Sequence, residues 1–200
     1  MPADDRDTAV PEAAAVPDAV PDAVPDAALR DELARLFPDG VPNLYRTLLR
    51  NPPVMAALVA LKQRLRAGRL TEAEHCLVAL EVAHASECGY CEAALCHAAG
   101  DLLGIDPQRL RGTGDGTGTG TGGGTGGGTG ETRHALLREA TRAMIEARGK
   151  LGRAQIARYE RQGLDFDLLL EIVAVIGEYT LATFAANLDR TRIDPEYRLG

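Results

Sequence analysis

The residues best suited to redox chemistry lie together in the stretch SECGYCEAALCHAAG, residues 86–100. It contains Cys88, Cys91 and Cys96, three of the four cysteines of the chain, and also His97. Cys88 and Cys91 form a C-x-x-C pair, whose thiols can join in a disulfide when the pair lies at a helix start. The free N–H groups and the positive dipole end of such a helix lower the pKa of a thiol. The pair is therefore predicted to attack a peroxide or a disulfide.

Within this pair we expect Cys91 to be the attacking thiolate, because it lies inside the first turn of the expected helix. Cys88 is then the resolving thiol, which closes the disulfide. This order is a hypothesis that sulfenic acid trapping in single Cys→Ser variants tests.

Two other interpretations of the thiols compete with the redox one. C-x-x-C is also half of a four-ligand zinc site, and His84 and His97 are close by, but a second ligand pair at standard spacing is missing. Alternatively the thiols are inert and buried, which suits Cys76 and Cys96 within their apolar surroundings. The C-x-x-C pair itself has polar neighbours, and this favours the redox interpretation.

Composition and charge narrow the class of protein. The chain has 200 residues, 45% of them hydrophobic, and a formal net charge of −7 with no dense Lys/Arg block, so we expect one soluble core and no nucleic-acid partner. No uncharged run is long enough to span a membrane, so no membrane partner is expected. The acidic N-terminus does not resemble a secretion signal, which predicts a cytoplasmic location without persistent disulfides.

Two biased segments divide the chain. Residues 1–27 repeat the unit V-P-D-A and are predicted to be a disordered tail. Residues 112–131 consist almost entirely of Gly and Thr and are predicted to be a flexible insertion. Residues 28–111, with the C-x-x-C pair, and residues 132–200 are then two helical parts of the same domain.

The remaining segments have helical periodicity. Thr71 and Glu74 have capping-box spacing and predict a helix that starts there, and the next helix opens around Cys88 and runs to Gly104. Further helices are expected over 27–37, 52–68, 133–149, 153–163 and 165–190. The last should be the central and most buried one, with Glu171 and Glu178 as a solvated stripe on one face.

The string LTEAEHCLVALEVAHASECGYCEAALCHAAGDLLGI resembles the core of the carboxymuconolactone decarboxylase and AhpD-like alkylhydroperoxidase superfamily. The resemblance extends upstream through an Asn-Pro helix start and downstream to Asn187, and covers most of residues 36–197. It implies an all-α, AhpD-like helical bundle that assembles into homo-oligomers, as dimers, trimers or hexamers.

The C-x-x-C pair is similar to that of the AhpD-like branch, whose dithiol reduces peroxides and is recharged by an external dithiol, such as a lipoylated protein. In that branch a Glu and a His form a proton relay to the thiols, but Cys76 and Leu95 occupy those positions here. Tyr90 matches an aromatic residue common in the family. The nearest substitutes for the relay are Glu74, Glu81, His84 and His97.

The favoured function is that of a peroxiredoxin-type, alkylhydroperoxidase-like thiol oxidoreductase. Its partners are a hydroperoxide substrate and an external dithiol reductant, and no metal or organic cofactor is required. A second interpretation is a non-catalytic oligomeric or interaction scaffold that lost the relay. The third and weakest is decarboxylation of a lactone acid, for which Arg46, Arg50 and Arg66 offer cationic groups.

Overall fold

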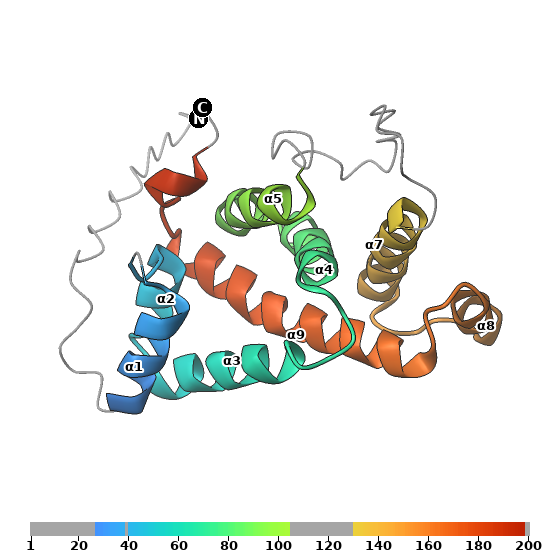
Figure 1. Ribbon diagram of the computed structural model, residues 1–200, viewed down its shortest axis with the longest axis horizontal. Helices are drawn as coiled ribbons and strands as arrows, with labels where there is room; N and C mark the ends of the chain where they lie inside the picture. Colours follow the sequence, from blue (N-terminus) through green and yellow to red (C-terminus); the bar gives the residue numbers. More distant parts are fainter. Residues whose placement is uncertain (1–26, 39, 105–129, 199–200) are drawn as a thin grey trace, which may run out of the picture.

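The structure is a computed structural model that describes residues 27–38, 40–104 and 130–198 (Figure 1). The expected tail over 1–27 and the expected insertion over 112–131 lie outside these residues, apart from their last one or two positions. The described residues contain no strand and form an all-helical fold, as predicted. The helices are α1 Ala27–Leu36, α2 Asn43–Leu48, α3 Pro52–Leu65, α4 Glu72–Ala85, α5 Gly89–Leu103, α7 Gly130–Ala147, α8 Arg153–Arg161, α9 Phe166–Asp189 and the short 3-10 helix η2 Pro195–Tyr197.

Side-chain caps explain where the helices begin. The hydroxyl of Thr71 accepts the N–H of Glu74 at 3.2 Å, and the carboxylate of Glu74 accepts the N–H of Thr71 at 2.9 Å, which confirms the capping box. Asp165 caps α9 in the same way by accepting the N–H of Leu168 at 2.9 Å. Helix α5 ends at Gly104 in the left-handed conformation, at the predicted boundary.

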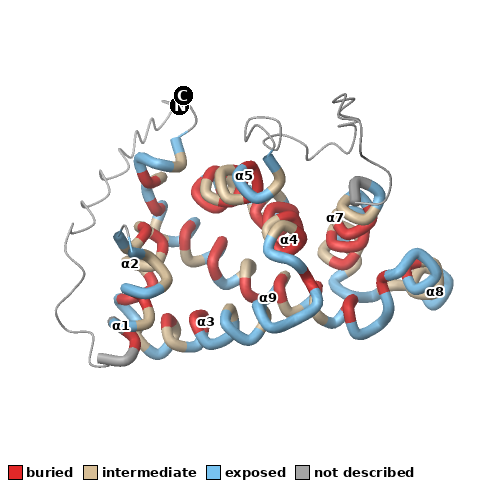
Figure 2. Tube along the Cα trace, in the orientation of Figure 1, coloured by how far each residue is buried: buried red, intermediate tan, exposed pale blue. Residues whose placement is uncertain are grey.

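Helix α4 lies at the centre of the packing, between α5, α7 and α9. Helix α9 runs along the molecule, with α1–α3 toward one end and α7 and α8 toward the other (Figure 1). Figure 2 shows α4 mostly buried, whereas α9 alternates between buried and exposed residues. The expectation that the last helix is the most buried one is therefore wrong, because α4 occupies that place and α9 leaves one apolar face open.

Helix α9 is also the described helix that is long and apolar enough to cross a membrane, judged by length and composition only. Within the protein, 39% of its most apolar window is buried, and it packs against α2, α3, α4, α5 and α7. The core helix of a globular domain has the same length and composition.

The two glutamates of α9 do not form a solvated stripe, which corrects the prediction. Glu171 accepts the N–H groups of Arg69 at 3.0 Å and Leu70 at 2.9 Å, so it holds the loop that leads into α4. Gly68 precedes this loop, and a Cβ at that position would lie 2.1 Å from Oε1 of Glu171. Glu178 is only 2% exposed and faces the interior, as the next subsection describes.

Candidate active site

The turn between α4 and α5 places Cys88 at the junction of the two helices. Glu87 adopts the left-handed conformation at φ 49°, and its N–H donates to the carbonyl of His84 at 3.0 Å. The N–H of Cys88 donates to the carbonyl of Ala83, also at 3.0 Å. These two bonds are a Schellman motif, which ends α4. Cys88 completes this motif and is at the same time the N-cap residue of α5.

Helix α9 holds this turn from the side. Asn187 donates its side-chain N–H to the carbonyl of Ser86 at 2.8 Å, and the hydroxyl of Thr183 donates to that of Ser86 at 3.1 Å. Asn187 is one of the residues on which the family resemblance depends. The two contacts fix the turn that carries Cys88, although they come from a helix about a hundred residues further along the chain.

The thiols of Cys88 and Cys91 lie together at the start of α5. The backbone N–H of Cys91 donates to the sulfur of Cys88 at 3.4 Å, and the two side chains are hydrogen-bonded to each other. Both cysteines are reduced and buried, with 1% and 4% of their surface exposed. The predicted proximity of the two sulfurs is therefore present in the structure.

The hydrogen bonds separate the pKa values of the two thiols. The Cys91 thiol and the N–H groups of Cys91 and Tyr90 donate to Cys88, which lowers the pKa of Cys88 to about 7, while burial and Glu92 oppose the shift. The pKa of Cys91 is raised, because its thiol donates to Cys88 and is buried. These shifts favour the thiolate at Cys88, whereas the sequence predicted it at Cys91; which of the two thiols attacks a peroxide stays a prediction. The thiolate is favoured at Cys88 because the N-cap residue receives the free N–H groups of the helix.

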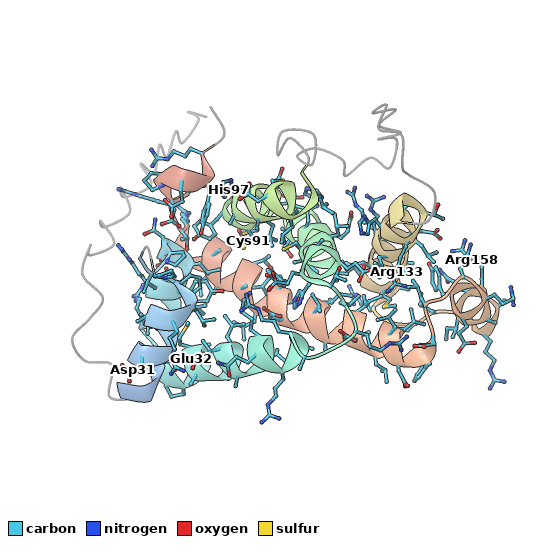
Figure 3. The ribbon with its side chains drawn as sticks, viewed as in Figure 1. Asp31, Glu32, Cys91, His97, Arg133 and Arg158 are labelled. Atoms are coloured by element: carbon cyan, nitrogen blue, oxygen red, sulfur yellow. The ribbon has the colours of Figure 1, made fainter. Side chains whose placement is uncertain are left out.

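A cavity of about 440 Å³ gives access to the second thiol. Cys91 and Tyr90 line it from α5, His75 and Cys76 from α4, and Tyr179 from α9. Cys88 is not among the described residues that line this cavity. Figure 3 labels Cys91 on the side of α5 toward α9, and His97 on the side toward η2. A small molecule that enters the cavity therefore meets the sulfur of Cys91 first.

The two positions that the resemblance assigns to a relay line the same cavity. Cys76 and Leu95 both line it together with Cys91. Leu95 has no proton to exchange, and burial raises the pKa of the Cys76 thiol. These two positions therefore hold no group that exchanges a proton near neutral pH.

The four substitutes expected from the sequence are all turned to other partners, and none is among the described lining residues. Glu74 caps α4 and pairs with Arg133 of α7. Glu81 pairs with two arginines of α7, Arg138 and Arg142. Both carboxylates are thus held in ion pairs with arginines of α7.

The two histidines among these substitutes have partners other than the thiols. His97 is 3.7 Å from Asp101 and packs on the ring of Tyr197. His84 is half-buried, lies 3.9 Å from Glu92, and its ring nitrogens find no hydrogen-bond partner among the described residues. Burial lowers the pKa of His84, so its ring is neutral at pH 7.

Tyr90, between the two cysteines, connects α5 to α2 and to the residue that precedes η2. Its hydroxyl donates to Asp194 at 2.6 Å and accepts the N–H of Leu44 at 3.3 Å. Burial and the bond to Asp194 raise its pKa. Tyr90 therefore anchors the start of α5 and remains a neutral phenol.

Sequence reasoning missed a charged cluster beside the cavity, formed by Lys62, His75, Glu178 and Tyr179. The carboxylate of Glu178 lies 3.2 Å from Nε2 of His75 and 3.5 Å from Nζ of Lys62, which also lies 3.5 Å from the hydroxyl of Tyr179. Tyr179 and Glu178 help raise the pKa of Lys62, which stays protonated. The place of His75 next to the cap of α4 favours a solvent-facing side chain, but it is only 9% exposed. The signal that could have found the cluster is Glu178, a carboxylate in the middle of the most apolar helix.

The three arginines considered for a lactone acid have separate roles. Arg66 lines the cavity, but Arg46 donates to the carbonyl of Val41 at 2.9 Å and Arg50 pairs with Asp189 at 3.0 Å. Over the described ranges, no group of three or more His, Cys, Asp or Glu side chains is arranged to hold a metal ion.

Comparison with known proteins supports the fold. No family model matches the chain, and no curated protein matches it either. Among solved structures, the chain is similar to that of an uncharacterized peroxidase-related protein from Silicibacter sp. TM1040, with a TM-score of 0.68 and 20% sequence identity. The similarity covers 86% of this chain and 90% of that chain. At this identity the match shows a shared fold, which is consistent with an AhpD-like helical fold.

Proposed function

We propose that the chain is an AhpD-like thiol oxidoreductase that reduces hydroperoxides with the Cys88 and Cys91 dithiol. The observation that supports this most is the hydrogen-bonded thiol pair at the start of α5, with Cys91 open to the cavity and Cys88 behind it. The peroxidase-related structural neighbour is consistent with the same chemistry.

In the proposed reaction the sulfur of Cys91 attacks the outer oxygen of the hydroperoxide. The proton of Cys91 passes to the thiolate of Cys88 along the hydrogen bond that joins them. The O–O bond breaks, and the leaving alkoxide takes a proton from the cavity, where His75 is positioned by Glu178 to supply it. Cys91 is now a sulfenic acid and the substrate has become an alcohol.

The second step closes the disulfide. Cys88 attacks the sulfenic sulfur of Cys91, the S–O bond breaks, and the oxygen leaves as water with the proton that Cys88 had received. An external dithiol then reduces the disulfide and is itself oxidised. The cavity of about 440 Å³ falls in the range of small-molecule sites, so it fits an organic hydroperoxide.

Thiol titration before and after a stoichiometric peroxide dose tests this function. The wild type should lose two thiols, Cys88→Ser should accumulate a trappable sulfenic acid, and Cys91→Ser should form none. Cys96→Ser is the matched control, because Cys96 is fully buried in the same helix, and it should behave as the wild type. Sulfenic acid that forms in Cys91→Ser and not in Cys88→Ser would reverse the roles of the two cysteines.

A non-catalytic scaffold is the second candidate. The observation in its favour is that Cys76 and Leu95 occupy the relay positions beside Cys91 and offer no neutral-pH proton exchange there. If all four thiols of the folded protein stay unreactive toward peroxide, this function replaces the peroxidase.

A further inference from the structure

Helix α9 carries a stripe of large apolar side chains on the side away from the core. Its six large side chains are 36% to 89% exposed, although contact of apolar surface with water is unfavourable. Their spacing keeps them within about 40° of one line along the helix, with Gly177 at the middle. The stripe consists of Phe166, Leu170, Val173, Gly177, Leu181, Phe184 and Leu188.

The apolar residues of the stripe have the same spacing on both sides of Gly177. Val173 and Leu181 lie four residues from it, Leu170 and Phe184 seven, and Phe166 and Leu188 eleven. An antiparallel second copy of α9 that crosses at Gly177 therefore places an apolar side chain opposite every apolar side chain. This self-complementarity is what an interface around a two-fold axis requires.

Gly177 adds a second, independent observation. Its backbone is helical without positive φ, so the conformation does not need glycine. A Cβ built there meets no described atom within 4 Å. Glycine in the middle of a helix costs about 1 kcal/mol relative to alanine. Ala174 and Thr180 lie three residues before and after it. Because the side chains at the centre of the stripe are small, another helix backbone can approach closely there.

The area of the stripe lies at the lower end of the range of specific interfaces. From the exposed fractions, its six large side chains present roughly 600 Å² a copy, against about 800 Å² a partner in a standard interface. No member of the stripe is charged, so pairing two copies leaves no buried ion without a counterion.

We propose that the α9 stripe is the two-fold interface of a homodimer, in which two α9 helices cross antiparallel at Gly177. The proposal does not depend on the thiol chemistry. It differs from a three-fold assembly through this face, because such an interface joins two different patches and gains nothing from a symmetric stripe.

Mass measurement in solution by light scattering tests the interface. The wild type should have twice the 21.2 kDa of the chain, and Leu170→Lys or Phe184→Glu alone should halve the mass. The double variant should restore the dimer, because it places each new Lys opposite a new Glu of the second copy. Leu61→Lys, at an exposed leucine on α3, is the control and should remain dimeric. A monomeric wild type, or single variants that stay dimeric, would overturn the proposal.

A cross-link keeps the test valid if the charged variants do not fold. Gly177→Cys should form a disulfide between copies, since the two new thiols meet on the axis. Phe166→Cys should not, because the two copies of that position lie about 33 Å apart. Cross-linking of Phe166→Cys to itself indicates a parallel arrangement and contradicts the proposal. So does a wild type that is monomeric alone but floats with phosphatidylcholine–phosphatidylglycerol vesicles, because the stripe then binds lipid.

Discussion

The backbone N–H of Cys91 points at the sulfur of Cys88 from 3.4 Å, and the Cys91 thiol donates to the same atom. The negative charge of the dithiol is therefore favoured at Cys88, while the cavity opens on Cys91. A thiolate at Cys88 has a second use in this arrangement, because a thiol of low pKa is a good leaving group when the disulfide is reduced.

The pH dependence of thiolate absorbance should report this charge. In the wild type we expect thiolate absorbance to rise with a midpoint near pH 7, from Cys88. In Cys91→Ala the midpoint should move up toward 9, because the donating thiol is lost while the backbone N–H remains. In Cys88→Ala no thiolate should form near pH 7. A midpoint near 7 in Cys88→Ala would assign the low pKa to Cys91.

The same shift links stability to pH. The pKa of Cys88 is lower in the folded chain than its ordinary value of 9.0, so between pH 7 and 9 the unfolded chain binds more protons. The free energy of unfolding should therefore rise from pH 7 to 9, relative to Cys88→Ala, and the contribution should vanish below pH 7. Urea unfolding at several pH values measures it. A wild-type curve parallel to that of Cys88→Ala would show that the charge does not depend on folding.

His75→Gln should slow the reduction of an organic hydroperoxide by a factor of about 10². The reason is that His75 lines the cavity and is oriented by Glu178, whereas glutamine cannot supply a proton. The pH midpoint of Cys88 should not change, which separates a proton-transfer role from a distorted thiol pair. His97→Gln is the matched control, since His97 pairs with Asp101 and is not itself among the described residues that line the cavity. Equal rates in the two variants would remove His75 from the mechanism.

Gly68→Ala should destabilise the fold by about 1–3 kcal/mol. The new Cβ would lie 2.1 Å from Oε1 of Glu171 and 2.9 Å from the carbonyl oxygen of Leu65. Glu171 could retreat only by releasing the two N–H groups that it accepts. Gly152→Ala is the control, because a Cβ there meets nothing in the described structure, and its φ of −69° suits any residue. Thermal unfolding of the two variants checks this, and equal midpoints would contradict it.

Glu87→Gly should stabilise the protein by about 0.5–1 kcal/mol. Glu87 is exposed and held at φ 49°, a conformation that glycine adopts without strain. Glu160→Gly, at an exposed helical position of α8, should instead lose about 1 kcal/mol. Chemical denaturation measures both signs. A loss in Glu87→Gly would mean that the side chain contributes more than the strain removes.

Local signals predicted the helix boundaries well. The capping box at Thr71 and the glycine at position 104 act within a few residues, and the structure confirms both. Cys76, Cys91 and Leu95 line one cavity, and their spacing spans only two successive helices. Such features depend on contacts that are short in sequence.

The remaining features depend on contacts that are long in sequence. The pairing of His75 with Glu178 joins residues more than a hundred positions apart, so neither could be recognised alone. The sequence did not show that Glu74 and Glu81 form ion pairs, because their arginine partners lie on α7, far along the chain. The apolar length of α9 indicated a core helix, but hydropathy does not distinguish a side chain buried in its own chain from one that is free to meet a second copy.

The cavity that opens on Cys91 and leaves Cys88 behind it has a kinetic consequence. Oxidant and reductant must use the same entrance in turn, because both exchange electrons through one sulfur atom. Turnover should then follow ping-pong kinetics. An excess of the electron donor should inhibit turnover, because the donor competes with the peroxide for access to Cys91. In the proposed peroxidase reaction, turnover would therefore be fastest at a balanced ratio of peroxide to electron donor.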